Sequence, residues 1–153
     1  MLYSAAMMMR ALLCILIGVS ALAAADAPPA ATYKTEAQLF GALIAGAATP
    51  DMLTAAVSNG DHHRINIVRR TKAAGAVAHG GATELHHIID GSGTLVTGGT
   101  MVRPAGGRGA TIQNGVSRHV GKGDVILVPA GTPHWYTDLD GTITYLEVRW
   151  EER

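Results

Sequence analysis

Beyond Gly60 the chain consists of short runs rich in β-branched residues, and glycine-containing turns separate these runs. The predicted strands are RINIVRR, TELHHIID, GTLVTGG, GDVILVP and GTITYLEVRW. No helical periodicity lies between them, which argues against parallel strands joined by helices. The spacing is typical of an antiparallel sandwich or barrel, so we predict an all-β fold for residues 61–153.

The segment before Gly60 has a different pattern, which predicts two short helices. The first is expected over Thr35–Ala47, because Thr35 and the following Gln38 form a capping-box pattern ahead of an apolar stripe. The second is expected over Pro50–Ser58, with Thr49 as its N-cap and Asn59–Gly60 as its end. Residues 26–60 are therefore interpreted as a linker followed by helices.

Residues 1–25 have the pattern of a cleavable signal peptide. Arg10 precedes an apolar run from Ala11 to Ala23, and small residues then lead to Asp26. The run is shorter than the roughly 20 residues that a membrane-spanning helix needs. We therefore expect export to the periplasm or the medium, with no stable membrane insertion after cleavage. An uncleaved anchor is the alternative interpretation.

Composition limits the function classes. The single cysteine, Cys14, lies in the expected signal segment, so cysteine nucleophiles and zinc–thiolate sites are excluded from the mature chain. Twelve basic and twelve acidic residues give a formal net charge of zero, which argues against a nucleic-acid partner or an anionic membrane surface. The arginine pair Arg69–Arg70 is too sparse for an anion site and is expected to be solvated.

Two stretches carry the residue types of a metal site. The first is HGGATELHHIIDGSG, in which period-two geometry places Glu84, His86 and Ile88 on one face of a strand. The second is GDVILVPAGTPH, in which a tight corner of proline and glycine precedes His134. The second stretch resembles the second motif of the cupin superfamily, and His79 through Glu84 to Gly91 is similar to the first motif. The resemblance covers roughly residues 64–149 and implies a double-stranded β-helix, the jelly-roll barrel.

The first motif departs from the family pattern at one position. The family has two histidines separated by one residue, and here Val77 stands in place of the first. The resemblance then implies His79, Glu84 and His134 as metal ligands, a set that matches the facial triad of non-haem iron. His86, on the same strand face as Glu84, is a candidate fourth nitrogen ligand. Fe²⁺, Mn²⁺, Ni²⁺ and Zn²⁺ are all compatible with nitrogen and oxygen donors.

Three functions compete at this point. The first is a metal-dependent enzyme of the dioxygenase, lyase, decarboxylase or isomerase type that acts on a small organic molecule, with Glu84 as a ligand or a proton shuttle. The second is a non-catalytic cupin that binds a small molecule or a sugar and has a decayed metal site, as the loss of a histidine at Val77 suggests. The third is a structural role as a homodimer, because cupin-like barrels commonly pair their sheets.

Overall fold

The computed structural model describes residues 30–106 and 109–151, and from Thr32 onward these form one compact unit. The expected signal segment, residues 1–25, lies outside the described residues. Within the described ranges, no helix is long and apolar enough to span a bilayer.

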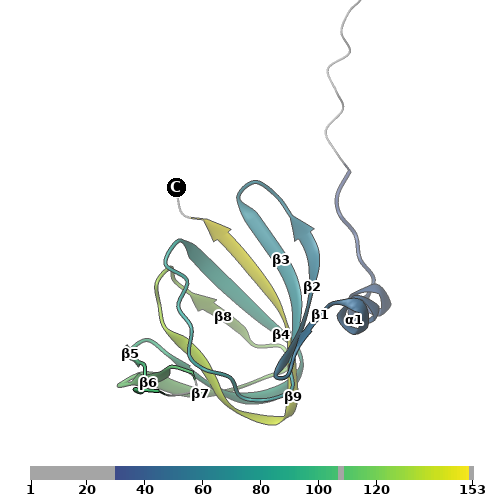
Figure 1. The fold of residues 1–153 in the computed structure, drawn as a ribbon. Helices are drawn as coiled ribbons and strands as arrows, with labels where there is room; N and C mark the ends of the chain where they lie inside the picture. The colour runs from purple at the N-terminus through teal and green to yellow at the C-terminus, as the bar shows by residue number, and fades with distance from the viewer. Residues whose placement is uncertain (1–29, 107–108, 152–153) are drawn as a thin grey trace, which may run out of the picture. The chain divides into compact units, whose positions relative to one another are not determined.

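Nine strands and one helix make up the described part of the chain (Figure 1). Seven strands lie in one antiparallel sheet with the order β1-β2-β3-β9-β4-β7, and β8 pairs with β4 beside β7. The short strands β5 and β6 form a separate hairpin. The bounds are α1 Glu36–Ala45, β1 Ala47–Thr49, β2 Met52–Asn59, β3 His63–Arg70, β4 Ala82–Thr97, β5 Thr100–Val102, β6 Thr111–Gln113, β7 Val116–Gly121, β8 Val125–Val128 and β9 His134–Glu151. The predicted all-β class is confirmed.

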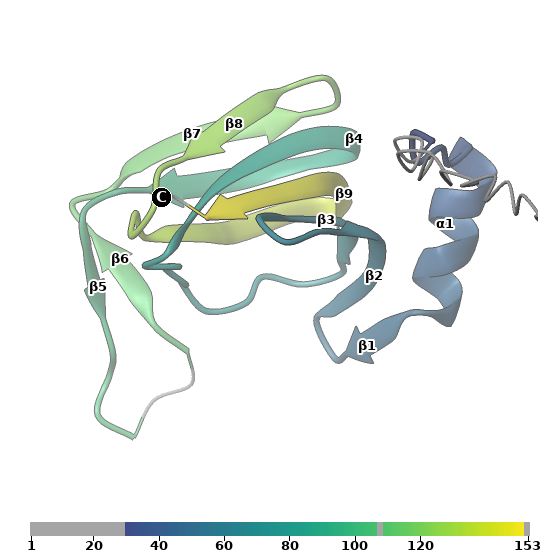
Figure 2. The ribbon, with the colours of Figure 1, turned by 90° about the horizontal axis from the view of Figure 1, so that it is seen from above.

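The two longest strands, β4 and β9, curl the sheet into an open barrel (Figures 1 and 2). They pair with each other along nearly their whole length, and register shifts interrupt the pairing near Gly91. Gly91 has φ +76°, and a Cβ there would lie 1.9 Å from the carbonyl oxygen of Thr142. Only glycine tolerates both conditions, so this residue allows β4 to bend while it stays against β9.

The helix α1 begins as the sequence predicts. The Thr35 hydroxyl accepts a hydrogen bond from the backbone of Gln38, and the Gln38 side chain accepts one from the backbone of Thr35. The helix contacts β2 and β3 and buries Leu43 completely. Arg69 on β3 places its guanidinium 5.1 Å from the ring centre of Phe40 on α1. The side chain of Arg69 therefore lies on the outer, helix-covered face of the sheet.

The second predicted helix is wrong. Residues 50–58 instead form the turn between β1 and β2 and most of β2, which pairs antiparallel with β3 through contacts such as Thr54 opposite Val68. Pro50 lies in the turn before β2 instead of in a helix, and β2 ends at Asn59, directly before Gly60. The segment between them gains more from sheet pairing than from local helix formation, because β2 covers a β3 edge that would otherwise leave its backbone groups unpaired.

One end of the barrel interior is apolar. The cross-strand register of β3, β9 and β4 places Val68, Tyr145 and Ile88 side by side, and all three are buried. Other buried side chains pack around this row. Together the core cluster consists of Val68, Ile88, Leu95, Val120, Tyr136, Ile143 and Tyr145. Burial of these side chains stabilises the barrel and fixes the inward direction of their strands.

Candidate metal centre

The same three strands become polar toward the other end of the barrel. Two residues from the apolar row, the register places Asn66, Glu147 and His86 side by side. Two residues further, Arg149 on β9 lies opposite Glu84 on β4. Because side chains alternate along a strand, residues two apart share a face. The chain therefore builds a polar compartment directly above its apolar core.

His79 reaches this compartment from the segment that leads into β4. Among the described residues this segment makes only isolated bridges, including Val77 with His134. The backbone carbonyl of His79 accepts a hydrogen bond from the Gly131 amide at 2.9 Å. This hydrogen bond joins the glycine-rich turns of the two sequence motifs. Val77 lines the same inner cavity as His79 and His134.

His134 is the first residue of β9, directly after the predicted tight corner, and its ring orientation is fixed. Its Nδ1 lies 3.1 Å from the carbonyl oxygen of Thr132, which can only accept, so Nδ1 carries the proton. Burial lowers the pKa of His134 below 6.5, although the Thr132 carbonyl and the charge of Glu84 act in the opposite direction. The neutral ring therefore presents the lone pair of Nε2 to the interior, which is the state that binds metals.

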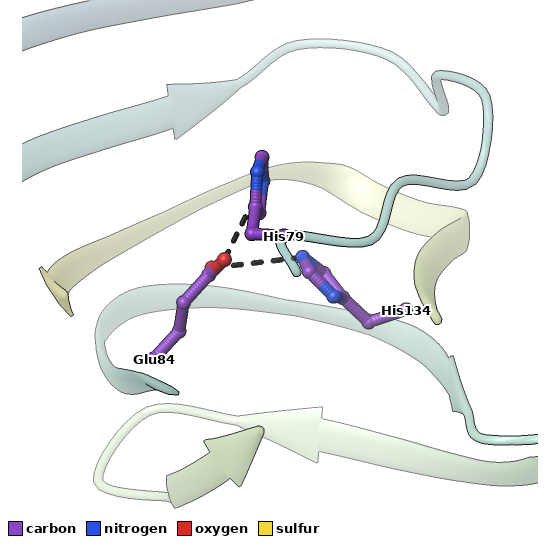
Figure 3. Close-up of side chains that lie close together, drawn as sticks. All are labelled: His79, Glu84 and His134. Atoms are coloured by element: carbon purple, nitrogen blue, oxygen red, sulfur yellow. Dashed lines mark ion pairs between the residues drawn. The ribbon is translucent and has the colours of Figure 1, made fainter. Parts of the chain in front are cut away.

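Glu84 lies between the two histidines (Figure 3). Its Oε1 is 3.4 Å from Nε2 of His79, and its Oε2 is 3.6 Å from Nε2 of His134. The side chain is 1% exposed, and this burial alone would raise its pKa. The hydrogen bond from His86 and the charges of His134, Arg149 and His79 outweigh burial and lower the pKa below 4.5. Glu84 is therefore an ionised carboxylate at neutral pH.

These three side chains fit a divalent ion. One ligand atom from each of His79, Glu84 and His134 lies within 4.8 Å of the others. Donors about 2.1 Å from one ion stand roughly 3 to 3.5 Å apart, close to the separations found here. The Oε1 atom of Glu84 is buried and has no hydrogen bond within the described chain. Nε of Arg149 is an ion-pair partner at 3.6 Å, too far for a hydrogen bond, and a divalent ion would give this buried charged oxygen a direct bond.

His86, the candidate fourth ligand, contacts Glu84 directly. Its Nε2 donates to Oε2 of Glu84 at 3.2 Å, and its Nδ1 lies 3.1 Å from the hydroxyl of Tyr136. Burial raises the pKa of Tyr136, so this hydroxyl keeps its proton. A second group of candidate ligands, Glu84, His86 and Glu147, is formed on this side of the carboxylate. His86 is thus grouped with Glu147 rather than with His79 and His134.

No motif in the sequence marks Glu147 and Arg149 as site residues. Arg149 donates from Nη2 to Oε2 of Glu147 at 3.0 Å and lies 3.1 Å from Nε2 of His79, and its Nε is 3.6 Å from Oε1 of Glu84. The guanidinium therefore contacts the same His79 nitrogen that an ion would use. The alternation Tyr145, Glu147, Arg149 along the predicted last strand was the available signal for a shared inward face.

Two cavities meet at the site. The inner one, about 240 Å³, lies inside the barrel against His79 and His134. The outer one, about 940 Å³, is a groove between the β2–β3 turn, the segment around His79 and the end of β9. Three residues line both cavities, namely Asn66, His79 and Arg149. A small molecule can therefore reach the candidate ligands from the groove.

Neither protein-family models nor curated protein sequences match the chain. Solved structures do. A cupin superfamily protein from Desulfitobacterium hafniense is 19% identical, with 80% of this chain and 97% of that chain covered at a TM-score of 0.51. KdgF from Halomonas sp. is 13% identical, with 70% and 86% covered at 0.51. Fe(II)-HppE is 13% identical, with 67% and 51% covered at 0.53.

The chain has the barrel fold of this cupin superfamily protein. The resemblance seen in the two sequence motifs is confirmed at the level of the fold, and so is the predicted jelly-roll barrel. At these identities the comparison concerns the shape of the barrel alone. The chemistry of this chain depends on its own residues.

Proposed function

We propose that this cupin is an exported, metal-dependent enzyme that acts on a small organic molecule, with one divalent ion held by His79, Glu84 and His134. The observation that carries the proposal is the buried Oε1 of Glu84, which makes no hydrogen bond in the described chain and lies 3.4 Å from Nε2 of His79. The shared barrel of Fe(II)-HppE supports the view that such a fold can hold a divalent ion. The signal-peptide pattern of residues 1–25 supports export.

A bound divalent ion would polarise a substrate oxygen or lower the pKa of bound water. The chain's own residues supply the remaining functions. Glu84 is ionised and offsets part of the ion's charge, while His86 holds its second oxygen in place. His134 is fixed by Thr132 with its Nε2 toward the site. Glu84 is also the carboxylate best placed to accept a proton there.

Metal titration tests the proposal directly. Chelator-treated protein, titrated calorimetrically with Zn²⁺ and separately with Mn²⁺, should take up one ion per chain. His134→Ala should lower the affinity by a hundredfold or more, because it removes one of three ligands. His119→Ala is the matched control, since this histidine on β7 is 64% exposed and, within residues 30–106 and 109–151, pairs only with Asp140 at 3.5 Å.

Two results would contradict the metal site. One is the absence of stoichiometric uptake of either ion by the wild-type chain. The other is an equal loss of affinity in His119→Ala and His134→Ala.

A non-catalytic binding cupin is the second candidate, and one observation favours it. Arg149 places a cationic group 3.1 Å from Nε2 of His79, where it satisfies the lone pair that an ion would need. In addition, Val77 stands where the family pattern has the first histidine, so this chain lacks that ligand. In this alternative, Arg149 is a permanent internal counter-ion for Glu84, and the barrel binds its ligand without a metal.

The variant Arg149→Met separates the two candidates. Two unit charges 4 Å apart interact by about 4 kcal/mol at an effective dielectric constant of 20. The repulsion between Arg149 and a bound ion is smaller than this value, because the Arg149 side chain is 23% exposed and its guanidinium also pairs with Glu147. In a metal-binding cupin, Arg149→Met should therefore bind Zn²⁺ about tenfold more tightly than the wild type in the same calorimetric titration.

Arg118→Met is the control for a general loss of positive charge, since Arg118 is exposed on β7. In the non-catalytic alternative, the wild type takes up no ion and Arg149→Met gains the ability. Equal Zn²⁺ affinities in the wild type and Arg149→Met would show that Arg149 does not compete with the ion.

A further inference from the structure

The inner cavity contains a second arginine that the metal site does not use. Arg70, at the end of β3, lines this cavity together with Arg149. Its Nε donates to the hydroxyl of Tyr145 at 3.0 Å, and its guanidinium lies 5.2 Å from the ring centre of Tyr136. The expectation that Arg70 is solvated is therefore wrong, because the side chain is held inside the barrel. No carboxylate pairs with it in residues 30–106 or 109–151.

The hydrogen-bonding groups around this cavity are unbalanced. Glu147, the carboxylate that lines it, has both oxygens bonded: Asn66 donates to Oε1 at 3.1 Å and Arg149 donates to Oε2 at 3.0 Å. In contrast, the hydroxyl of Thr54 is buried without any hydrogen bond in the described chain, and Nε of Arg149 makes only a 3.6 Å ion pair with Oε1 of Glu84. The unsatisfied groups on the cavity wall can therefore all donate. A ligand that fills the cavity should bring acceptors.

The charges around the site lead to the same conclusion. Arg70 and Arg149 contribute two positive charges, and Glu84 and Glu147 contribute two negative charges, so the protein groups balance. A divalent ion at His79, Glu84 and His134 leaves the compartment with an excess of two positive charges. It also takes the His79 nitrogen to which Arg149 donates, which frees a further donor. An anionic ligand would compensate this excess in a site shielded from water.

We propose that the inner cavity is the binding site for a small carboxylate, whose oxygens are received by Arg70 and Thr54 beside the metal ion. The inference names the ligand class of the site proposed above and rests on it. A volume of about 240 Å³ corresponds to roughly eight water molecules at ~30 Å³ each, which suits a short organic acid. A longer substituent on that acid would extend past Asn66 and His79 into the outer groove.

The test uses propanoate and its neutral isostere propanamide as probes. Each is titrated into the full chain, with and without one equivalent of Zn²⁺, and chemical-shift changes give the dissociation constants. Propanoate should bind the Zn²⁺-loaded protein at least tenfold more tightly than propanamide does. Because coupling is reciprocal, propanoate should tighten Zn²⁺ binding by the same factor by which Zn²⁺ tightens propanoate binding.

Four variants locate the anion. Arg70→Met should weaken propanoate binding at least tenfold, and Arg70→Lys, which keeps the charge, should recover part of the loss. Thr54→Val removes only the hydroxyl and should weaken binding about threefold. Arg69→Met is the matched control: its side chain lies on the opposite face of β3 near Phe40, so binding should stay within twofold of the wild type.

The possible results separate this inference from the metal proposal. Equal binding of propanamide and propanoate would overturn it, as would equal effects of Arg70→Met and Arg69→Met. Tighter binding of inorganic phosphate with the same dependence on Arg70 would replace the carboxylate by a phosphate ligand. Zn²⁺ uptake without propanoate binding refutes only the carboxylate site. Propanoate binding that depends on Arg70 in a chain that takes up no Zn²⁺ refutes only the metal site.

Discussion

Replacing Glu84 by glutamine should lower the affinity for Zn²⁺ or Mn²⁺ by at least a hundredfold, equivalent to about 2.8 kcal/mol. The amide has the shape of the carboxylate but lacks the negative charge that binds the ion. Both groups of candidate ligands contain Glu84, so the effect is expected wherever the ion sits. Calorimetric titration measures the affinity, and circular dichroism verifies that the barrel is retained.

Glu147→Gln is the matched control for this variant. Glu147 belongs only to the group with His86, whereas His134 belongs only to the group with His79. If the ion lies between the two motif histidines, Glu147→Gln should change the affinity by no more than about threefold. A hundredfold loss in Glu147→Gln, together with normal binding in His134→Ala, would move the ion to the second group. Normal binding in Glu84→Gln would contradict both positions.

The largest expected loss of stability comes from Gly91→Ala, which should reduce the free energy of unfolding by about 3 kcal/mol or more. An alanine Cβ would lie 1.9 Å from the Thr142 carbonyl oxygen and 3.0 Å from its carbon, and the backbone has φ +76°. The positive φ alone costs about 1 to 2 kcal/mol, and the clash with the backbone of β9 adds to it. Urea-induced unfolding followed by tryptophan fluorescence measures the difference.

Gly141→Ala isolates the contribution of the clash. Gly141 also has a positive φ, +81°, but an added Cβ there meets no atom within 4 Å. This variant should lose only about 1 to 2 kcal/mol. If both variants unfold at the same urea concentration, the close approach of β4 and β9 at Gly91 does not limit the stability of the barrel.

The barrel and part of its site could be predicted because their signals are local in the sequence. Strand runs between glycines indicated the all-β fold. A corner of proline and glycine precedes His134, and two glycines follow His79. The structure brings the donor atoms of His79, Glu84 and His134 together. Whether they bind a metal remains a prediction that the titrations test.

The remaining site residues depend on register, which local patterns do not fix. Arg149 lies opposite Glu84, and Glu147 lies opposite His86, only because β4 and β9 pair with one particular alignment. Arg70 likewise enters the barrel, while its neighbour Arg69 points to the helix. A pair of adjacent arginines carries no sign of which one is inside. Side chains alternate along β3, so the alternation identifies the inward arginine only when another inward residue of the strand is known.

The error over residues 50–58 has a related cause. The end signals Pro50 and Gly60 are real, but they bound a strand as well as they bound a helix. The pairing of β2 with β3 decides the outcome, and this pairing is a tertiary effect.

The pairing of β9 with both β3 and β4 also has a kinetic consequence. Arg64 pairs with Arg149, and Thr83 pairs with Trp150, so these contacts close long loops of chain. Loops of this length form slowly, and β-rich chains with distant partners fold in milliseconds to seconds. The guanidinium of Arg149 and the carboxylate of Glu147 reach Glu84 only in that late step. Partly synthesised chains that lack β9 therefore contain His79 and Glu84 but neither His134 nor the assembled compartment.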